Sequence, residues 1–339
     1  MPQISRTIQL VARPVGSPKP SDFRMVSLPL PDPEPGEVLL QMLWLSLDPY
    51  MRGRMAEGRS YAPPTPLGHP PPSEAVARVL HSNDSALAPG EIVLVYDAWR
   101  DHAVRKASDC QKLDPGLGPV QRVLGVLGMP GLTAWAGLKH IGQPKPGETL
   151  VVGAATGAVG SLVGQIARLG GARVVGVAGG PEKCRYATGV LGLDDCLDRH
   201  SPGLDARLAK ACPDGIDVYF ELTGGAVLQA ALPLLNPFAR IPVCGTIASY
   251  NATTPPPGPD QLPALLRLIL TRSLIVRGFI VTEFEGYRPE FLTAMSGWLA
   301  SGAISCREDI TQGLENMVDA FTAMLEGRNF GKALVKLAD

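Results

Sequence analysis

Hydrophobic and polar residues follow two different patterns along the chain, and the pattern changes near residue 126. Before that point, short apolar runs such as Ile8–Val11, Val38–Leu45, Glu74–Leu80 and Glu91–Tyr96 are separated by polar or proline-rich turns. Many short runs without a helical period predict a β-rich lobe, folded as a partly closed barrel. After that point, apolar runs alternate with segments whose apolar residues recur at helical spacing. This second pattern predicts an α/β fold, an open parallel sheet with helices on both faces.

The second pattern resolves into individual elements. Strands are predicted at 149–152, 173–178, 195–197, 216–222, 240–244 and 274–281, and helices at about 158–169, 182–191, 226–235 and 262–270. Two amphipathic helices at 291–301 and 314–325 and a final strand at 332–337 follow, and we expect the last residues to return to the first lobe. The predicted domains are therefore 1–126 together with 305–339, and 127–304.

The turn 153–160 is a candidate nucleotide site. It follows the apolar strand Thr149–Val152, precedes a predicted helix, and consists of small residues in the pattern A-x-G-x-x-G. Small residues let the backbone approach a pyrophosphate, while free amides and the helix dipole favour its charge. The other interpretation is a tight connection in a domain that binds no nucleotide. The residues expected to contact the cofactor are Ala155, Thr156, Gly157, Ala158 and Val159.

The end of the second strand indicates which dinucleotide is bound. Sites for NAD usually carry an acidic residue about 20 positions after the glycine turn, which holds the adenosine ribose. Here Ala178–Pro181 has no carboxylate, and Lys183 follows in the first turn of the next helix. The missing repulsion and the nearby cation favour NADP, with Gly180 admitting the 2′-phosphate and Lys183 pairing with it. Lys183 can also be interpreted as a solvated helix residue.

Composition and charge argue against some partners and favour a soluble protein. The chain has 339 residues and a formal net charge of −1, without a long basic run, which argues against a nucleic-acid or membrane-surface partner. The N-terminal residues are mixed and polar, and the most apolar later stretch, Leu262–Val276, is interrupted by two arginines. We therefore expect a soluble, cytoplasmic protein. Its six cysteines are scattered and indicate neither a disulfide framework nor a zinc site.

Six stretches of the chain match one known family. They are LSLDPYMRGRM (45–55), GMPGLTAW (128–135), AATGAVGSLVGQIA (154–167), CGTIASYN (244–251), PPGP (256–259) and NFGKALVK (329–336). Together they resemble the zinc-independent medium-chain dehydrogenase/reductases, in the family's order and over nearly the whole chain. Within that superfamily they resemble the leukotriene B4 12-hydroxydehydrogenase and prostaglandin reductase branch, which includes alkenal double-bond reductases and bacterial curcumin reductase.

The resemblance implies a fold and a reaction. The fold is a Rossmann doubly wound parallel sheet plus a GroES-like barrel lobe, in a homodimer formed through the strand near 274–281. The reaction is NADPH-dependent reduction of the C=C bond of α,β-unsaturated aldehydes and ketones. Hydride goes to the β-carbon, and the enolate is then protonated at the α-carbon. Such a site must stabilise developing oxygen charge and exclude bulk water.

The resemblance also assigns roles to individual residues. Tyr50 is the candidate catalytic residue, in contact with the carbonyl or enolate oxygen, and the alternative is a core or rim aromatic residue. Asn329 matches the family's cofactor-contacting asparagine, and Phe279 and Val281 belong to the segment whose backbone holds the nicotinamide amide. Three more residues are expected at the cofactor: Arg199 at the 2′-phosphate, Tyr250 near a phosphate, and Cys244 beside the nicotinamide unless it is simply a buried thiol.

The chain departs from its relatives at several positions. Zinc-containing relatives carry Gly-His-Glu and a nearby cysteine, whereas this chain has Gly68-His69-Pro70 and Ser46-Leu47. His69 is therefore interpreted as a loop histidine, and no metal is expected. Leu222 replaces the usual asparagine, and Thr271 stands near the position of a tyrosine proposed as the proton donor in several relatives. The proton would then come from Tyr50, a ribose hydroxyl or water. These changes leave the reaction class intact and the substrate open.

Two alternatives to an enone reductase stay open. A quinone reductase would use the same hydride site with a broader pocket. A non-catalytic NADPH-binding protein, like the lens crystallins of this superfamily, would bind the cofactor without turnover.

Overall fold

The computed structural model describes residues 3–58, 60–114, 116, 118–255 and 260–339, and the described chain divides into two compact units. Unit 1 comprises residues up to 124 together with 308–339, and unit 2 comprises 125–307. The stretch 256–259, one of the motifs that carry the family resemblance, lies outside the described residues.

Unit 2 is built on a six-stranded sheet whose strands pair in parallel. The strand order is β10-β9-β8-β11-β12-β13, so the chain starts in the middle and winds outward in both directions. This confirms the predicted doubly wound parallel sheet. The strands are β8 (Thr149–Val152), β9 (Arg173–Ala178), β10 (Asp195–Asp198), β11 (Ile216–Phe220), β12 (Leu235–Val243) and β13 (Ile275–Gly278).

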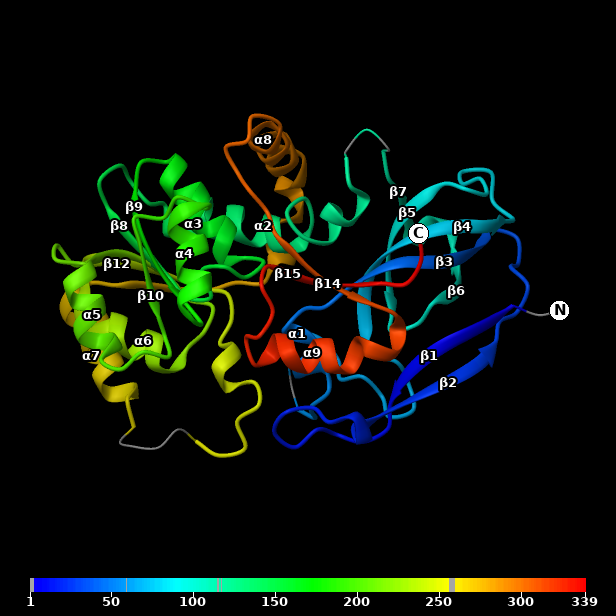
Figure 1. The fold of residues 1–339 in the computed structure, drawn as a ribbon, viewed down its shortest axis with the longest axis horizontal. Helices are drawn as coiled ribbons and strands as arrows, with labels where there is room; N and C mark the ends of the chain where they lie inside the picture. The colour runs from blue at the N-terminus through cyan, green and yellow to red at the C-terminus, as the bar shows by residue number, and fades with distance from the viewer. Residues whose placement is uncertain (1–2, 59, 115, 117, 256–259) are drawn as a thin grey trace. The chain divides into compact units, whose positions relative to one another are not determined.

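Helices cover both faces of this sheet, as the ribbon of unit 2 shows (Figure 1). The reason lies in the buried strands: Leu150 and Val152 of β8 join one apolar cluster, while Val151 joins another on the opposite face. The first cluster includes residues of α2, α3, α4 and α8, and the second includes residues of α5, α6 and α7. The helices are α2 (Met129–Ala136), α3 (Gly160–Leu169), α4 (Pro181–Gly189), α5 (Leu204–Ala211), α6 (Gly225–Ala231), α7 (Leu262–Arg272) and α8 (Arg288–Ala300).

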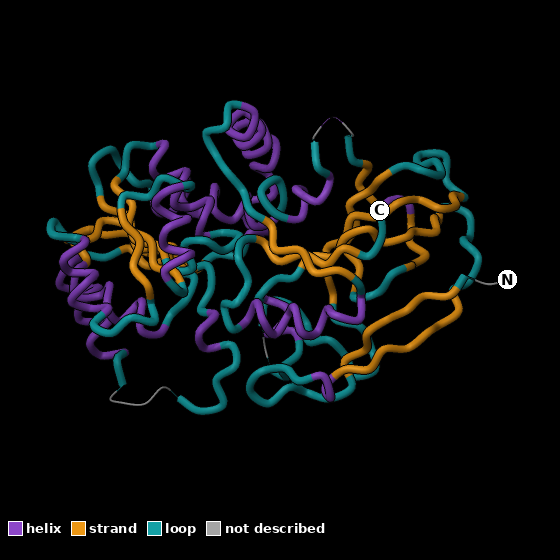
Figure 2. The backbone as a smooth tube through the Cα atoms, in the orientation of Figure 1, coloured by secondary structure: helices purple, strands orange, loops and turns teal. Residues whose placement is uncertain are grey.

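Unit 1 is rich in strands (Figure 2). Its main sheet has the order β14-β15-β3-β4-β5-β7, with β6 also paired to β3, and β1 pairs separately with β2. The strands are β1 (Ile4–Leu10), β2 (Phe23–Pro29), β3 (Glu37–Ser46), β4 (Pro72–Ser82), β5 (Ile92–Ala98), β6 (His102–Lys106), β7 (Cys110–Lys112), β14 (Glu308–Gln312) and β15 (Lys332–Lys336). Two helices, α1 (Tyr50–Arg54) and α9 (Met317–Leu325), complete the unit. As predicted, the last strand returns to the first lobe, where β15 pairs with β3.

The prediction that the first lobe is rich in strands is confirmed, but its strands form a mixed sheet. Antiparallel pairings link β3, β4, β5 and β15, whereas β14 runs parallel to β15, so the sheet is mixed. Among the described strands these pairings follow an open path and do not close into a barrel.

Some local predictions differ from the structure. Helix α3 begins at Gly160 rather than near Ala158, because the chain is still turning through Ala158 and Val159. Leu169, at the last position of the helix, is 47% exposed. Helix α5 was not predicted, since only Leu208 and Ala211 of it are buried and its apolar period is short.

The most apolar predicted helix corresponds to α7. No helix in the described part of the chain is long and apolar enough to cross a membrane.

Candidate active site

The turn between β8 and α3 brings backbone segments unusually close together. Ala154 has a φ of +47°, a left-handed conformation that is strained for a residue with a side chain. A Cβ on Gly160 would lie 2.3 Å from the carbonyl oxygen of Ala154, and a Cβ on Gly153 would lie 2.6 Å from Oγ1 of Thr223. Glycine is therefore needed at both positions for steric reasons, which is the property that a pyrophosphate-binding turn requires.

The predicted cofactor residues Ala155, Thr156, Gly157, Ala158 and Val159 all lie in this turn. The N–H of Ala155 donates to the carbonyl of Val177 (3.1 Å), and this hydrogen bond ties the turn to β9. Because α3 starts directly after the turn, its N-terminus stands at the carboxyl end of β8. Helix N-termini stabilise anions there, so the turn fits a dinucleotide phosphate.

The end of β9 forms a second part of the site. Gly179 and Gly180 follow the strand, and Gly180 has a φ of +92° that favours glycine. If Gly179 carried a Cβ, that atom would lie 3.2 Å from Nε of Arg199 and 3.1 Å from Nε2 of His200. Lys183 is in the first turn of α4, directly after these glycines. The side chains of Arg199 and His200 therefore lie beside Gly179, while the space around Gly180 is open. Lys183 and Arg199 were predicted at this position from the sequence, whereas His200 was not.

Asp198, which was also not predicted, fixes the backbone in this part of the site. Its Oδ1 accepts hydrogen bonds from the N–H of Gly180 (2.8 Å) and of His200 (3.0 Å). These backbone hydrogen bonds, that of His200 first, lower the pKa of Asp198. The N–H of Gly180 is thus already bound, so Gly180 can make room for a phosphate but is not its donor. Asp198 was missed because it ends β10, the neighbouring strand, and not β9.

A buried carboxylate lies where β11 ends. Glu221 is 2% exposed, and its Oε1 accepts hydrogen bonds from the N–H groups of Thr223 (2.6 Å) and Gly224 (2.7 Å). Burial raises the pKa of Glu221. Its carbonyl oxygen accepts a hydrogen bond from the N–H of Cys244 (3.0 Å). Glu221 therefore fixes the loop before α6 and the start of the segment after β12.

The residues predicted beside the nicotinamide follow the ends of β12 and β13. Burial raises the pKa of the Cys244 thiol to about 12, so this side chain is a neutral thiol near pH 7. The N–H of Phe279 donates to the carbonyl of Val243 (3.2 Å), and Val281 begins a 3₁₀ turn two residues later. Tyr250 follows a short 3₁₀ helix, and burial raises the pKa of its phenol. The structure therefore places Cys244 and Phe279 after neighbouring strands of the same sheet edge.

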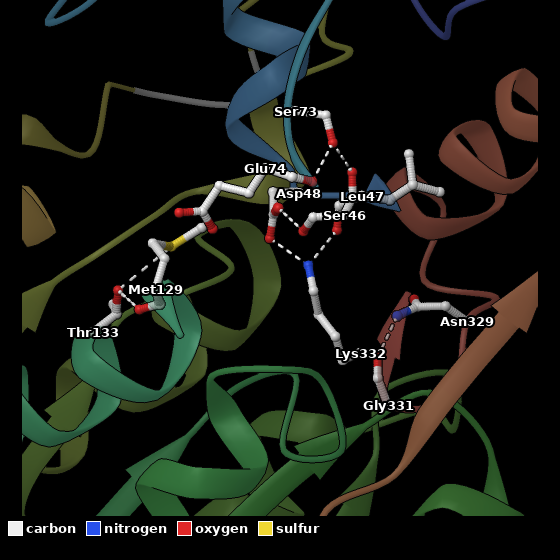
Figure 3. A network of polar contacts seen from close by, with 10 residues as sticks. All are labelled: Ser46, Leu47, Asp48, Ser73, Glu74, Met129, Thr133, Asn329, Gly331 and Lys332. Atoms are coloured by element: carbon white, nitrogen blue, oxygen red, sulfur yellow. Dashed lines mark hydrogen bonds and ion pairs between the residues drawn. The ribbon is translucent and has the colours of Figure 1, made fainter. Parts of the chain in front are cut away.

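Unit 1 contains a buried polar network at the start of α1 (Figure 3). Nζ of Lys332, on β15, donates to Oδ1 of Asp48 (2.6 Å) and to the carbonyl of Leu47 (2.8 Å). The hydroxyl of Ser46 donates to the second carboxylate oxygen of Asp48. Both charged side chains are 5% exposed. Asp48 directly precedes Pro49 and α1, where a carboxylate often caps a helix, but here it is bound by Lys332 and Ser46 and α1 begins without a side-chain cap.

Tyr50 is the first residue of α1 and is partly buried. Burial raises the pKa of its phenol well above the ordinary value, and Asp48, Tyr96 and Glu74 raise it further. The phenol therefore stays protonated at any working pH. A neutral O–H group of this kind can donate to a carbonyl or enolate oxygen.

The remaining predicted residues have local partners. Nδ2 of Asn329 donates to the carbonyl of Gly331 (2.8 Å), just before β15. His69 is exposed in a loop, with Nδ1 3.4 Å from the carbonyl of Leu67. Thr271 lies on the exposed face of α7. Within the described ranges, no three His, Cys, Asp or Glu side chains gather as metal ligands.

The chain is similar to known proteins along nearly its whole length. One family model, described as the N-terminal domain of oxidoreductase, matches residues 6–113, and another, described as zinc-binding dehydrogenase, matches residues 158–297. NADPH-dependent curcumin reductase of Escherichia coli is 50% identical, over 99% of this chain and 98% of the relative. Prostaglandin reductase 1 of Rattus norvegicus is 41% identical, over 95% of each chain. The crystal structure of CurA from Vibrio vulnificus in complex with NADPH is 47% identical with a TM-score of 0.94, and the match covers 98% of this chain and 99% of that one.

Proposed function

We propose that this chain, which belongs to the medium-chain dehydrogenase/reductases of the curcumin and prostaglandin reductase family, reduces the C=C bond of α,β-unsaturated aldehydes and ketones with NADPH. One observation carries the proposal: the 50% identity to an NADPH-dependent curcumin reductase over 99% of this chain.

The residues of unit 2 fit NADPH. The turn 153–160 provides the close backbone approach and the helix N-terminus that a pyrophosphate needs. We assign the 2′-phosphate to Lys183 and Arg199, with Gly180 leaving room for it and His200 beside it. We place the nicotinamide near Cys244 and the backbone of Phe279 and Val281, with Tyr250 as a further contact. The assignment of Asn329, which belongs to unit 1, rests on the family resemblance. When bound, NADPH supplies the hydride that reduces the β-carbon of the substrate.

Tyr50 is the residue we assign to the second half of the reaction, the protonation of the enolate. We propose that its phenol O–H donates a hydrogen bond to the substrate oxygen and then a proton to the enolate. Such a donor must keep its proton until charge develops on the substrate, and burial together with Asp48 keeps the phenol neutral. The buried Asp48–Lys332 pair fixes the turn from which Tyr50 projects.

The experiment that tests the function is NADPH consumption with a panel of enals, enones, nitroalkenes and quinones. Turnover of enals or enones above quinones at matched concentration is the expected result. Preference for quinones would favour the quinone reductase alternative, and NADPH binding without turnover would favour a non-catalytic protein. Tyr50→Phe should lower kcat about 100-fold or more if the phenol acts as acid. An unchanged kcat would remove Tyr50 from the mechanism.

We also propose a homodimer, paired through β13. This strand is the last in the sheet of unit 2, and its residues are exposed, including Ile275 at 54% and Val276 at 41%. An exposed apolar edge strand offers unpaired backbone groups to a second copy. Light scattering after size exclusion should give a dimer, and Ile275→Lys should give a monomer. Val190→Lys, an exposed apolar residue after α4, is the control that should stay dimeric. A wild-type monomer at micromolar concentration would contradict the proposal.

The cytoplasm is the proposed location. All six cysteines are free thiols, which suits a reducing compartment.

A further inference from the structure

The phenol of Tyr50 has a neighbour that links it to water. The hydroxyl of Tyr96, on β5, acts on the Tyr50 phenol and raises its pKa. Nη1 of Arg54 also donates to the Tyr96 oxygen, at 3.1 Å. Tyr50 and Arg54 are four residues apart on α1, so both side chains point to the same side of that helix. Tyr96 is 53% exposed, whereas Tyr50 is partly buried.

The surroundings of Tyr50 make a phenolate there costly. The carboxylates of Asp48 and Glu74 both act on its phenol, and Glu74 on β4 stands directly opposite Tyr96 on β5. A Tyr50 that had given its proton to an enolate would be a negative charge in a partly buried site, near Glu74 and near Asp48, whose own charge Lys332 balances. It must recover a proton before the next turnover, and the hydroxyl that acts on it belongs to Tyr96.

We propose that Tyr96 relays a proton from solvent to Tyr50 after each reduction, with Arg54 as the residue that positions Tyr96. In this step the O–H bond of Tyr50 breaks, its proton forms the new C–H bond at the α-carbon, and the electron pair stays on the Tyr50 oxygen. That oxygen takes the proton of Tyr96, and Tyr96 takes one from water. One proton is consumed for each hydride delivered. The guanidinium of Arg54 stabilises the negative charge that passes through the Tyr96 oxygen. The relay rests on the proposed function.

The test is a comparison of first and later turnovers in Tyr96→Phe, which keeps the ring and removes the hydroxyl. Because Tyr50 starts protonated, a rapid-mixing experiment should show one NADPH per site oxidised at the wild-type rate. Later turnovers should then be about tenfold slower or more. The slow phase should carry a larger solvent deuterium isotope effect than wild type, and small acids such as imidazolium should accelerate it. The Kd of NADPH, measured by fluorescence, should not change.

Two further variants sharpen the test. Arg54→Met, which removes the guanidinium, should also oxidise the first NADPH per site at the wild-type rate, and its later turnovers should be slowed less than those of Tyr96→Phe. Tyr287→Phe removes a hydroxyl of similar exposure, 44%, from unit 2 and should behave as wild type.

Several outcomes would overturn the relay. Wild-type steady-state rates in Tyr96→Phe, or equal slowing of the first and later turnovers, would each exclude it while leaving the proposed function intact. A wild-type enzyme that oxidises NADPH with no enone or enal would remove the proposed function and the relay with it.

Discussion

Replacing Lys332 with methionine should destabilise unit 1 strongly, because the change leaves a carboxylate buried without its counter-charge. The side chains of Lys332 and Asp48 are each 5% exposed, and Nζ of Lys332 also donates to the carbonyl of Leu47. Methionine keeps most of the volume but removes both hydrogen bonds. Removing one member of such a pair costs about 3–5 kcal/mol of unfolding free energy. For a domain of this size that lowers Tm by roughly 6–20 °C, measurable by calorimetry and by urea unfolding.

A matched control lies on the same strand. Lys336 pairs with Asp339, whose side chain is 98% exposed, so Lys336→Met should cost at most about 1 kcal/mol. Adding Asp48→Asn to Lys332→Met removes the stranded charge, and the double variant should be less destabilised than the two single variants predict together. If the unfolding free energies of Lys332→Met and Lys336→Met differ by less than about 1 kcal/mol, the buried pair has no structural importance and the reasoning is refuted.

Three other changes probe unit 2. Lys183→Ala should raise KM for NADPH about 10- to 100-fold and barely change KM for NADH, and an equal effect on both cofactors would exclude the 2′-phosphate assignment. Gly160→Ala places a methyl group 2.3 Å from the Ala154 carbonyl oxygen, so NADPH affinity should fall and the free energy of unfolding should decrease by about 1–3 kcal/mol. A variant with unchanged NADPH affinity would contradict the turn geometry. Burial raises the pKa of Glu221, so the stability from its bound proton is fully present below the unfolded pKa of about 4.3 and is lost as pH rises through the folded pKa. Glu221→Gln should therefore gain stability relative to wild type as pH rises above that value in urea titrations, and a difference that does not change with pH would count against it.

The sheet of unit 2 could be predicted because buried parallel strands are continuous apolar runs. The predicted bounds of β8 and β9 are the observed ones, since each run is interrupted sharply by glycine or charged residues. Strand β12 was predicted from 240, but it begins at Leu235. Phe238 in this strand has a φ of +65°, and the register with β11 shifts nearby, so the run lacks a regular period. Irregular strands escape pattern reasoning for this reason.

The return of the last strand to the first lobe could be predicted, but its register and its side-chain contacts could not. Lys332 and Asp48 are 284 positions apart, and nothing in either local pattern indicates that β15 returns beside the end of β3 at that register. Asp198 and His200 were missed for a related reason, because they reach the β9 glycines from the neighbouring strand. The turn 153–160 could be predicted from the sequence because its residues are contiguous. Their role in binding stays a prediction.

The place of β15 in unit 1 has a consequence for synthesis of the chain. Strand β15 pairs with β3 and supplies the ammonium group that neutralises Asp48, yet it is translated after all of unit 2. Roughly 200 residues must follow the early strands before it emerges, which takes roughly 10–40 s at about 5–20 residues per second. Until then the newborn first lobe has an acidic group without its counter-ion and an open strand edge. Unit 2 can therefore finish folding before unit 1, although the early strands of unit 1 precede it in the chain.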